Sequence, residues 1–226
     1  MMELRAEKIS RDFLRYSAKD GYFTAVAETD FTLAAGTLTA VTGRSGSGKS
    51  TLLHILGGLM KPVTGRVLLD ETDIYVLGEA ERDALRRCHI GIAPQRLMSL
   101  AALTVRENIL LPALLTGQEE TAAVRADVLM ECLGIRKLAS VAPSELSGGE
   151  LRRVTIARAL VMQPGILLAD EPTGDLDEEN TQSVLSLLRE TADAGTAVLL
   201  VTHESEARNY ADTCYTMTVG KLEKIA

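Results

Sequence analysis

The chain has 226 residues, few cysteines and no long apolar run. Its three cysteines, Cys88, Cys132 and Cys214, are far apart and show no C-x-x-C spacing, which indicates reduced thiols in a cytosolic protein. No apolar run approaches the ~20 residues that a membrane-spanning helix needs. The segment Met1–Arg5 lacks the apolar stretch of a signal peptide. We therefore expect a cytoplasmic protein that reaches a membrane only through a partner.

Excess positive charge is also missing. There are 24 basic and 31 acidic side chains, which gives a formal net charge of −7. Proteins that bind nucleic acid nonspecifically are usually basic, so we expect no nucleic-acid partner. Hydrophobic residues make up 46% of the chain, an ordinary globular composition, and this length can bury one substantial core. Repeats, low-complexity segments and an obvious linker are absent from the sequence as well.

What is present is an alternation of short apolar runs and helical patterns. The apolar runs predict buried strands at Leu38–Thr42, Ile166–Ala169 and Ala197–Val201. Helical patterns follow the first two runs, at Thr51–Leu56 and Glu178–Ala194, and Gly195 is a candidate for ending the second helix. Strand–helix–strand alternation predicts an α/β fold with a parallel sheet and helices on both faces.

Two regions depart from this alternation. The segment from about Leu97 to Ser144 has helical patterns at Thr104–Leu115 and Glu119–Leu133 and no clear strand, which predicts a helical insertion. Residues 1–35 alternate apolar and polar side chains, for example at Phe31 and Leu33, and predict an antiparallel β flank.

A complete phosphate-binding loop lies between a predicted strand and a predicted helix. Glycines there allow backbone N–H groups to surround a phosphate, and the helix start adds unpaired donors and a positive dipole end. Lys49 supplies a charge for the β- and γ-phosphates, and the Ser50 hydroxyl is a ligand for Mg²⁺. The candidate nucleotide-binding residues of this segment are Gly43, Arg44, Ser45, Gly46, Ser47, Gly48, Lys49, Ser50 and Thr51.

Two carboxylates, Asp170 and Glu171, follow the second predicted strand. In open α/β sheets, ligands bind at the carboxyl ends of the strands. Asp170 is suited to hold Mg²⁺, directly or through water, because this ion prefers hard oxygen ligands. Glu171 is suited to orient or deprotonate the attacking water. An acidic pair alone is more often a solvated turn, but beside a phosphate-binding loop it favours nucleotide hydrolysis.

The segment Leu146–Glu150, with the sequence Leu-Ser-Gly-Gly-Glu, separates this chain from other nucleotide hydrolases. Ser147 and Glu150 fit a capping box before an apolar-periodic helix at Leu151–Val161, and a helix start with two glycines is a second possible anion site. It follows the predicted helical insertion, so we expect it to lie away from the first site. A lobe that presents phosphate donors outward predicts a head-to-tail, two-fold dimer with two ATP molecules between the subunits.

These motifs together resemble the ATP-binding subunits of ABC transporters, and the resemblance covers essentially the whole chain. Leu146–Glu150, hereafter the signature, departs from the family's LSGGQ only at its last residue. The resemblance assigns Gln95 to the loop that senses Mg²⁺ and couples to the permease. It makes Glu171 the catalytic glutamate, places Asp177 in the D-loop and makes His203 the residue that contacts the γ-phosphate. It also implies nucleotide contacts from Ser147, Gly148, Gly149 and Glu150 of the opposite subunit.

The resemblance further implies one domain over residues 1–226. A P-loop NTPase core of the RecA-like type covers about 1–95 and 160–226, and a helical subdomain covers about 96–159. The segments Leu103–Pro112 and Glu171–Asp177 are similar to the MacB, LolD and FtsE group. Members of that group drive permeases that handle lipids, lipoproteins or peptides, or that transmit force across the membrane. ATP and Mg²⁺ are the implied ligands, and a second copy and integral permease subunits are the implied partners.

Some questions stay open at this point. The family stacks an aromatic side chain on adenine, and Phe13, Tyr16, Tyr22 and Phe23 all lie in the right region.

Two other functions are compatible with a nucleotide-binding site. A soluble ABC ATPase of DNA repair or translation usually has tandem domains or long coiled coils, and this chain has neither. A regulatory module without turnover would show an altered Glu171 or His203, and both are present. The transported substrate is chosen by the permease, so this sequence specifies neither the substrate nor the direction of transport.

Overall fold

The computed structural model describes residues 2–14, 21–96 and 98–225 and is built around a central six-stranded sheet. Its strand order is β10-β9-β3-β8-β7-β6, and every neighbouring pair is parallel except β9 and β10. The strands are β3 (Leu38–Thr42), β6 (Ile90–Ala93), β7 (Ile166–Asp170), β8 (Ala197–Thr202), β9 (Thr213–Thr218) and β10 (Lys221–Ile225). The three strands predicted from apolar runs therefore lie side by side, as β3, β8 and β7.

Side chains of the central strands alternate between two apolar cores. On β7, Leu167 and Ala169 join one core, whereas Ile166 and Leu168 join the other. This follows from the period of two along a strand. Because both faces are covered, β3, β7 and β8 are buried at every residue and read as continuous apolar runs.

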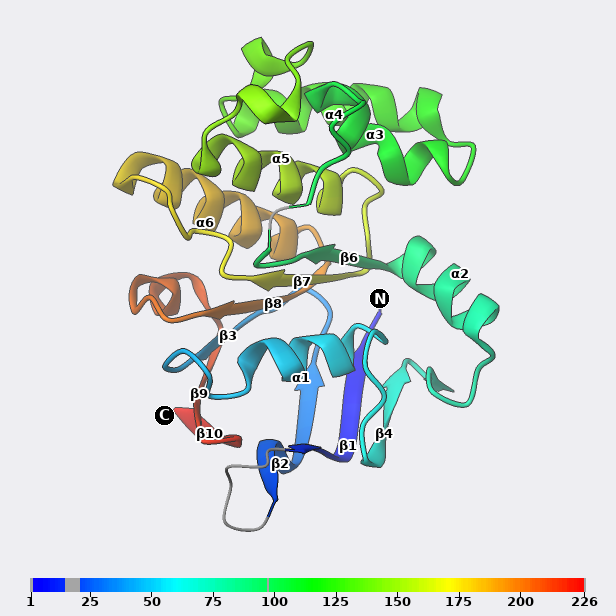
Figure 1. The fold of residues 1–226 in the computed structure, drawn as a ribbon, viewed down its shortest axis with the longest axis vertical. Coiled ribbons are helices and arrows are strands. Elements are labelled where there is room, and N and C mark those ends of the chain that lie inside the picture. The colour runs from blue at the N-terminus through cyan, green and yellow to red at the C-terminus, as the bar shows by residue number, and fades with distance from the viewer. Residues whose placement is uncertain (1, 15–20, 97, 226) are drawn as a thin grey trace.

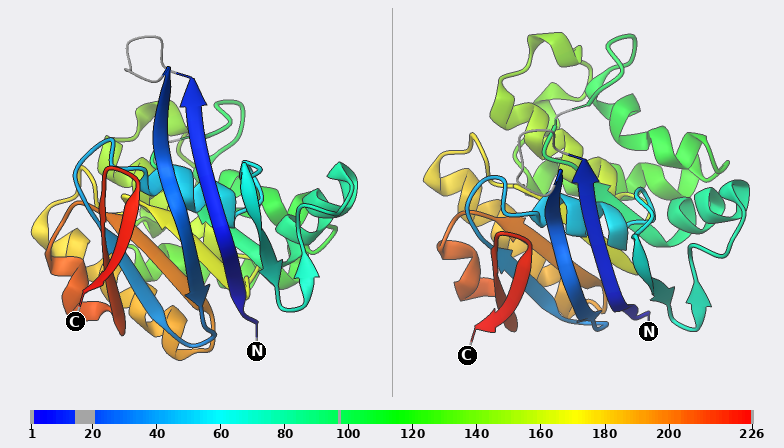
Figure 2. Two further views of the ribbon diagram at one scale, coloured as in Figure 1. Left: turned by 90° about the horizontal axis from the view of Figure 1, so that it is seen from below. Right: turned by 60° about the horizontal axis from the view of Figure 1, so that its bottom comes forward.

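A second, antiparallel sheet and helix α1 cover one face of the central sheet (Figure 1). The second sheet has the order β2-β1-β4-β5, and Figure 2 shows β1 and β2 lying side by side. Its strands are β1 (Leu4–Leu14), β2 (Tyr22–Leu33), β4 (Thr64–Leu69) and β5 (Thr72–Asp73), and α1 is Lys49–Leu56. The antiparallel flank predicted for residues 1–35 is confirmed, and β4 and β5 extend it with residues that the sequence patterns left unassigned.

Helices cover the other face (Figure 1). They are α3 (Val105–Leu114), α4 (Glu119–Cys132), α5 (Gly148–Leu160) and α6 (Glu178–Asp193), with short 3₁₀ turns at Arg136–Leu138, Pro143–Glu145 and Glu206–Tyr210. Helix α2 (Glu79–His89) leads directly into β6 at the sheet edge. Helix α5 packs against α3 and α4 and also against β6 and β7, so it connects the helical layer to the sheet. No helix in the described part of the chain is long and apolar enough to cross a membrane.

The predicted helix boundaries differ from the observed ones in small ways with local causes. Helix α5 begins at Gly148 rather than Leu151, because Ser147 and Glu150 form a complete capping box around its first turn. Thr104 and Glu107 cap α3 in the same way. Helix α6 ends at Asp193, and Gly195 follows with a φ of 108°, as expected for a glycine just beyond a helix.

Candidate functional site

The phosphate-binding loop joins β3 to α1, and strand β2 lies against it. Gly48 has a φ of 111°, and a Cβ atom there would lie 1.9 Å from the carbonyl oxygen of Ala25 on β2. Only glycine fits this position. Gly48 caps α1 without any side-chain hydrogen bond, and the first turn of α1 carries no acidic residue. The helix start therefore keeps its backbone donors and its positive dipole end for an anion.

Lys49 is buried, with 6% of its surface exposed, and its ammonium group points back into the loop. Its Nζ atom donates to the carbonyl oxygens of Gly43 at 2.8 Å and Arg44 at 3.2 Å. It also lies 3.7 Å from Oε1 of Glu171. The structure thus brings the predicted phosphate-binding cation and the predicted catalytic carboxylate together from distant parts of the chain.

A cleft of about 580 Å³ opens over the loop. It is lined by Phe13, Phe23, Ala25, Arg44, Ser45, Gly46, Gly48, Lys49, Ser50, Thr51, Gln95, Glu171 and His203. Among the aromatic candidates for adenine contact, Phe13 and Phe23 face each other in the β1–β2 register and line the cleft. The Tyr22 residue is 60% exposed and does not line it, and Tyr16 lies outside the described residues.

Glu171 comes directly after β7 in a left-handed conformation, with a φ of 50°. Such backbone costs about 1–2 kcal/mol for a residue with a side chain, and it is found where the surroundings hold a functional group in place. Its N–H donates to the carbonyl oxygen of Val201, and its Oε2 atom accepts from the Thr202 hydroxyl at 3.1 Å. The same Oε2 atom lies 2.8 Å from Nδ1 of His203.

His203 follows β8, the strand beside β7, and its side chain is 63% exposed. The family resemblance implies a phosphate contact for this side chain, and in the structure the side chain reaches Glu171. Thr202 is a functional residue that was not among the predicted ones. The signal was available, because a hydroxyl residue directly precedes the histidine at the end of a buried strand. Groups at the end of β8 thus hold the Glu171 carboxylate at the end of β7.

Asp170, the last residue of β7, is 2% exposed. Burial raises the pKa of its carboxyl above the usual value, and a hydrogen bond with Ser50 opposes this. Within the described residues, its Oδ1 atom is buried without a hydrogen-bond partner. A buried carboxylate oxygen without a partner is costly, and a bound cation would relieve that cost. Asp170, Ser50 and the cleft-lining Gln95 together supply the oxygen ligands that Mg²⁺ prefers.

The signature lies at the N-terminus of α5 and does not line this cleft in the described structure. Oε2 of Glu150 accepts from the backbone N–H of Ser147 at 2.8 Å and from its hydroxyl at 2.7 Å. These two bonds lower the pKa of the Glu150 carboxyl. A Cβ atom on Gly149 would lie 3.1 Å from the carbonyl oxygen of Asp175. The signature is therefore a capped helix start that packs against the D-loop of its own subunit.

The D-loop residue Asp177 is likewise outside the cleft. It caps α6 by accepting from the backbone N–H of Asn180 at 2.8 Å, and it also accepts from the amide group of Asn180. The structure therefore divides the predicted site residues into two groups. The phosphate-binding loop, Gln95, Glu171 and His203 surround one cleft, whereas the signature and Asp177 lie at helix starts away from it.

Comparison with known proteins gives a consistent result. Residues 26–174 match the family described as "ABC transporter". The chain is 40% identical over 227 residues to the lipoprotein-releasing system ATP-binding protein LolD of Shewanella sp. (strain MR-7), covering 99% of this chain and 96% of that protein. It is 45% identical over 197 residues to LolD of Psychrobacter arcticus, covering 86% of this chain and 87% of that protein.

Solved structures agree with the sequence relatives. The dimeric structure of MJ0796, a bacterial ABC transporter cassette, superposes with a TM-score of 0.88, at 28% identity and 99% coverage of both chains. A dimeric post-hydrolysis state of the same cassette, bound to ADP and Pi, superposes with a TM-score of 0.86 at the same identity and coverage. The similarity therefore extends over the whole fold, including the helical layer.

Proposed function

Because the chain belongs to the ABC transporter family and is its ATP-binding and ATP-hydrolysing subunit, we propose that it is the motor of a LolD-type, lipoprotein-releasing transporter. One observation carries the assignment of the site. A glycine-rich loop, a buried lysine, the strand-end carboxylate of Glu171 and a strand-end histidine line one cleft, and the Asp170 carboxyl bonds to Ser50 of that loop. The relatives named as lipoprotein-releasing ATPases support the transported class.

In the proposed reaction, backbone donors of Gly43–Thr51 and the Lys49 ammonium hold the β- and γ-phosphates of ATP. Phe13 and Phe23 are positioned for the adenine ring. The Glu171 carboxylate orients the attacking water and accepts its proton. Thr202 and His203 hold that carboxylate through its Oε2 atom, which leaves Oε1 on the side of Lys49.

Ser50, Asp170 and Gln95 are the residues that would hold Mg²⁺. The observation that supports this fit is the Oδ1 atom of Asp170, which is buried and has no hydrogen-bond partner among the residues that the structure describes. When bound, the ion neutralises charge on the β- and γ-phosphates. Gln95 follows directly after β6 and Pro94, so its position depends on the sheet edge next to α2 and α5.

Hydrolysis in this proposal requires a second copy of the chain. The signature caps its own helix outside the cleft, so its remaining N–H groups serve the ATP of the partner subunit. Dimeric cassettes among the similar structures support this arrangement. A head-to-tail, two-fold dimer would place one ATP between each phosphate-binding loop and the opposite signature.

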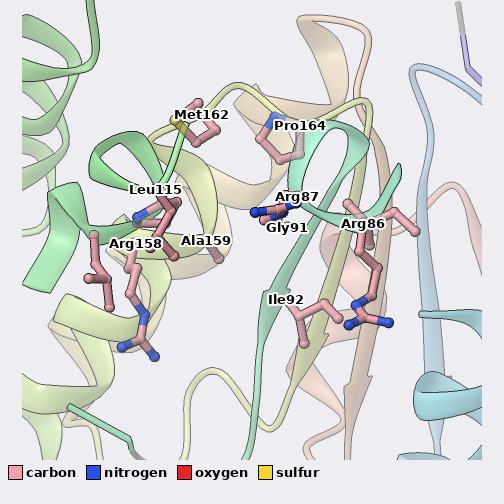
Figure 3. Close-up of a pocket in the computed structure, with 12 residues that line it drawn as sticks. Arg86, Arg87, Gly91, Ile92, Leu115, Arg158, Ala159, Met162 and Pro164 are labelled. Atoms are coloured by element: carbon pink, nitrogen blue, oxygen red, sulfur yellow. The ribbon is translucent and has the colours of Figure 1, made fainter. Parts of the chain in front are cut away.

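The permease subunits would dock in a groove of about 300 Å³ between α3, α5 and the α2–β6 junction (Figure 3). Apolar side chains such as Ile92, Leu115 and Met162 line it, together with arginines. Burial lowers the pKa of the Arg158 guanidinium, and no carboxylate in the described chain opposes this. An amphipathic permease helix that carries a carboxylate fits this lining, and it would hold the chain on the cytoplasmic face of the membrane.

Glu171→Gln tests the catalytic assignment. This variant keeps the shape of the side chain and removes its charge, so we expect steady-state ATP hydrolysis to fall by about a hundredfold or more, while ATP binding persists. Nucleotide affinity and hydrolysis are measured on the same preparations. Hydrolysis near the parent rate would show that another group activates the water.

The docking groove has a separate test in the native membrane. A photo-crosslinking amino acid at Leu115, which lines the groove, should attach the chain to one integral membrane protein. The same amino acid at Val124, which is 72% exposed on α4, is the matched control. Equal labelling of membrane proteins from both positions would reject the groove as the docking site.

A further inference from the structure

Arg152 lies on α5, two residues beyond the signature, and is 5% exposed. Its Nη1 atom donates to the carbonyl oxygen of Gln95 at 2.7 Å and approaches that of Pro94 at 3.4 Å. The signature helix is therefore bonded directly to the backbone of the loop that carries Gln95.

The other edge of the same guanidinium faces the loop after Glu171. Its Nη2 atom is 3.9 Å from Oδ2 of Asp175, and a Cβ atom on Gly174 would lie 3.5 Å from it. Its Nε atom is buried without a hydrogen-bond partner in the described chain. Burial lowers the pKa of Arg152, and the carboxylates of Asp175, Glu171 and Asp170 partly oppose this. A buried cation with one unpaired donor is kept here at an energetic cost.

We propose that Arg152 is a positioning residue that couples the signature helix to the Gln95 loop and to the loop after Glu171 within one subunit. The proposal rests on the proposed function, because it assumes that the signature serves the ATP of the partner. Arginine suits this role because its planar group bonds in two directions at once. When the partner's ATP binds the signature, a displacement of the signature would then be transmitted to the subunit's own catalytic cleft through a single side chain.

The first turns of α5 connect the signature directly to Arg152. Helix α5 is capped at Ser147 and continuous to Leu160, so its first turns move together. A displacement of the signature must carry Arg152 with it. The carbonyl oxygen of Gln95 then either follows or loses a charge-assisted hydrogen bond in a buried site, where such bonds are strongest.

The test compares Arg152→Met, which keeps most of the apolar stem and removes every donor, with Arg152→Lys, which keeps the charge and an N–H donor for the Gln95 carbonyl. Arg125→Met is the matched control, because Arg125 is half-buried and donates to the carbonyl oxygen of Leu160 at the far end of α5. Each is made in the full chain. The measurements are ATP affinity of the monomer, ATP-driven dimerisation in a Glu171→Gln background, turnover and its cooperativity in ATP.

For Arg152→Met we expect turnover to fall about tenfold and cooperativity to be lost, with monomer ATP affinity within about twofold of the parent. Arg152→Lys should recover part of the turnover, and Arg125→Met should match the parent. Equal losses in Arg152→Met and Arg125→Met, or a lysine variant as impaired as the methionine one, would overturn the proposal. If Arg152→Met does not fold, Arg152→Ala takes its place with the same expected results. A parent chain that neither dimerises nor hydrolyses ATP would instead reject the proposed function.

Discussion

The two helices that begin at glycine-rich segments begin in opposite ways. Helix α1 has the left-handed Gly48 at its cap, no side-chain cap and no acidic residue in its first turn. Helix α5 has Ser147 at its cap, and Glu150 returns a carboxylate to the same residue. The first helix start leaves its donors open to a ligand of its own subunit. The second satisfies part of its donors internally, which supports the proposal that it serves the nucleotide of a partner subunit.

Among the variants that test this difference between α1 and α5, the one that removes Lys49 should have the largest effect. Lys49→Ala deletes the buried ammonium that contacts the loop carbonyls and Glu171, and we expect ATP affinity of the monomer to fall by about a hundredfold or more. Ser147→Ala should leave that affinity unchanged, because the signature does not line the cleft. Nucleotide titration of both monomers checks this. A loss of affinity in the serine variant would mean that both helix starts serve the same ATP.

A matched pair of glycine substitutions tests whether the two helix starts differ in their need for glycine. Gly48→Ala places a Cβ atom against the Ala25 carbonyl in a left-handed conformation, whereas Gly148→Ala meets only the Cβ of Asp175 at 3.9 Å. We expect the first to lower the free energy of unfolding by about 2 kcal/mol or more and to impair ATP binding. The second should leave the fold intact within about 0.5 kcal/mol. Chemical denaturation measures both, and equal stability of the two variants would contradict the geometry.

The start of α5, unlike that of α1, should be needed for dimerisation rather than for ATP binding by the monomer. Ser147→Arg in a Glu171→Gln background should abolish ATP-driven dimerisation, because a long cation would fill the place of the partner's nucleotide. Loss of the cap also costs about 1 kcal/mol, so Ser147→Ala is the control for stability. Light scattering with and without Mg-ATP is the measurement. A dimer that forms without ATP and persists in the arginine variant would reject the sandwiched arrangement.

The smallest expected effect concerns Glu150. Its carboxylate stabilises the helix start through the bond from the Ser147 N–H. In the proposed dimer it would also lie near the γ-phosphate of the opposing ATP and repel it, and solvent and Mg²⁺ would screen part of that repulsion. Glu150→Gln should lower the ATP concentration for half-maximal hydrolysis by about threefold with turnover nearly unchanged. An ATP titration at fixed Mg²⁺ and salt decides this. A higher half-saturation value would mean that the carboxylate helps closure.

The same substitution changes the response to acid. Hydrogen bonds from Ser147 hold the pKa of the Glu150 carboxyl below its usual value in the folded protein. A lowered pKa adds stability above the unfolded value, and that stability is lost as the pH falls through the folded value. Glu150→Gln should therefore lose less stability than the parent on acidification, by a small amount because Glu150 is only partly buried and solvent screens its charge.

The sequence by itself determined the elements whose signals are local. Strands β3, β7 and β8 are buried on both faces, so their apolar runs were readable without any partner. The predicted capping box at Ser147 uses residues three positions apart, and the structure has it, together with a second one at Thr104 that has the same spacing. The phosphate-binding loop was also local, because its glycines, lysine and serine are consecutive.

Tertiary structure alone decided what depends on distant partners. Strands β4, β9 and β10 are only partly apolar and exist through pairing with β1, β3 and β9 respectively, so their own residues gave a weak signal. The contact of His203 with Glu171 joins the ends of two neighbouring strands, and the Arg152 bond to Gln95 joins a helix to a loop 57 positions away. Local patterns specify which groups are present, because propensity and capping act over a few residues. The packing of the sheet against its helices specifies which of those groups meet.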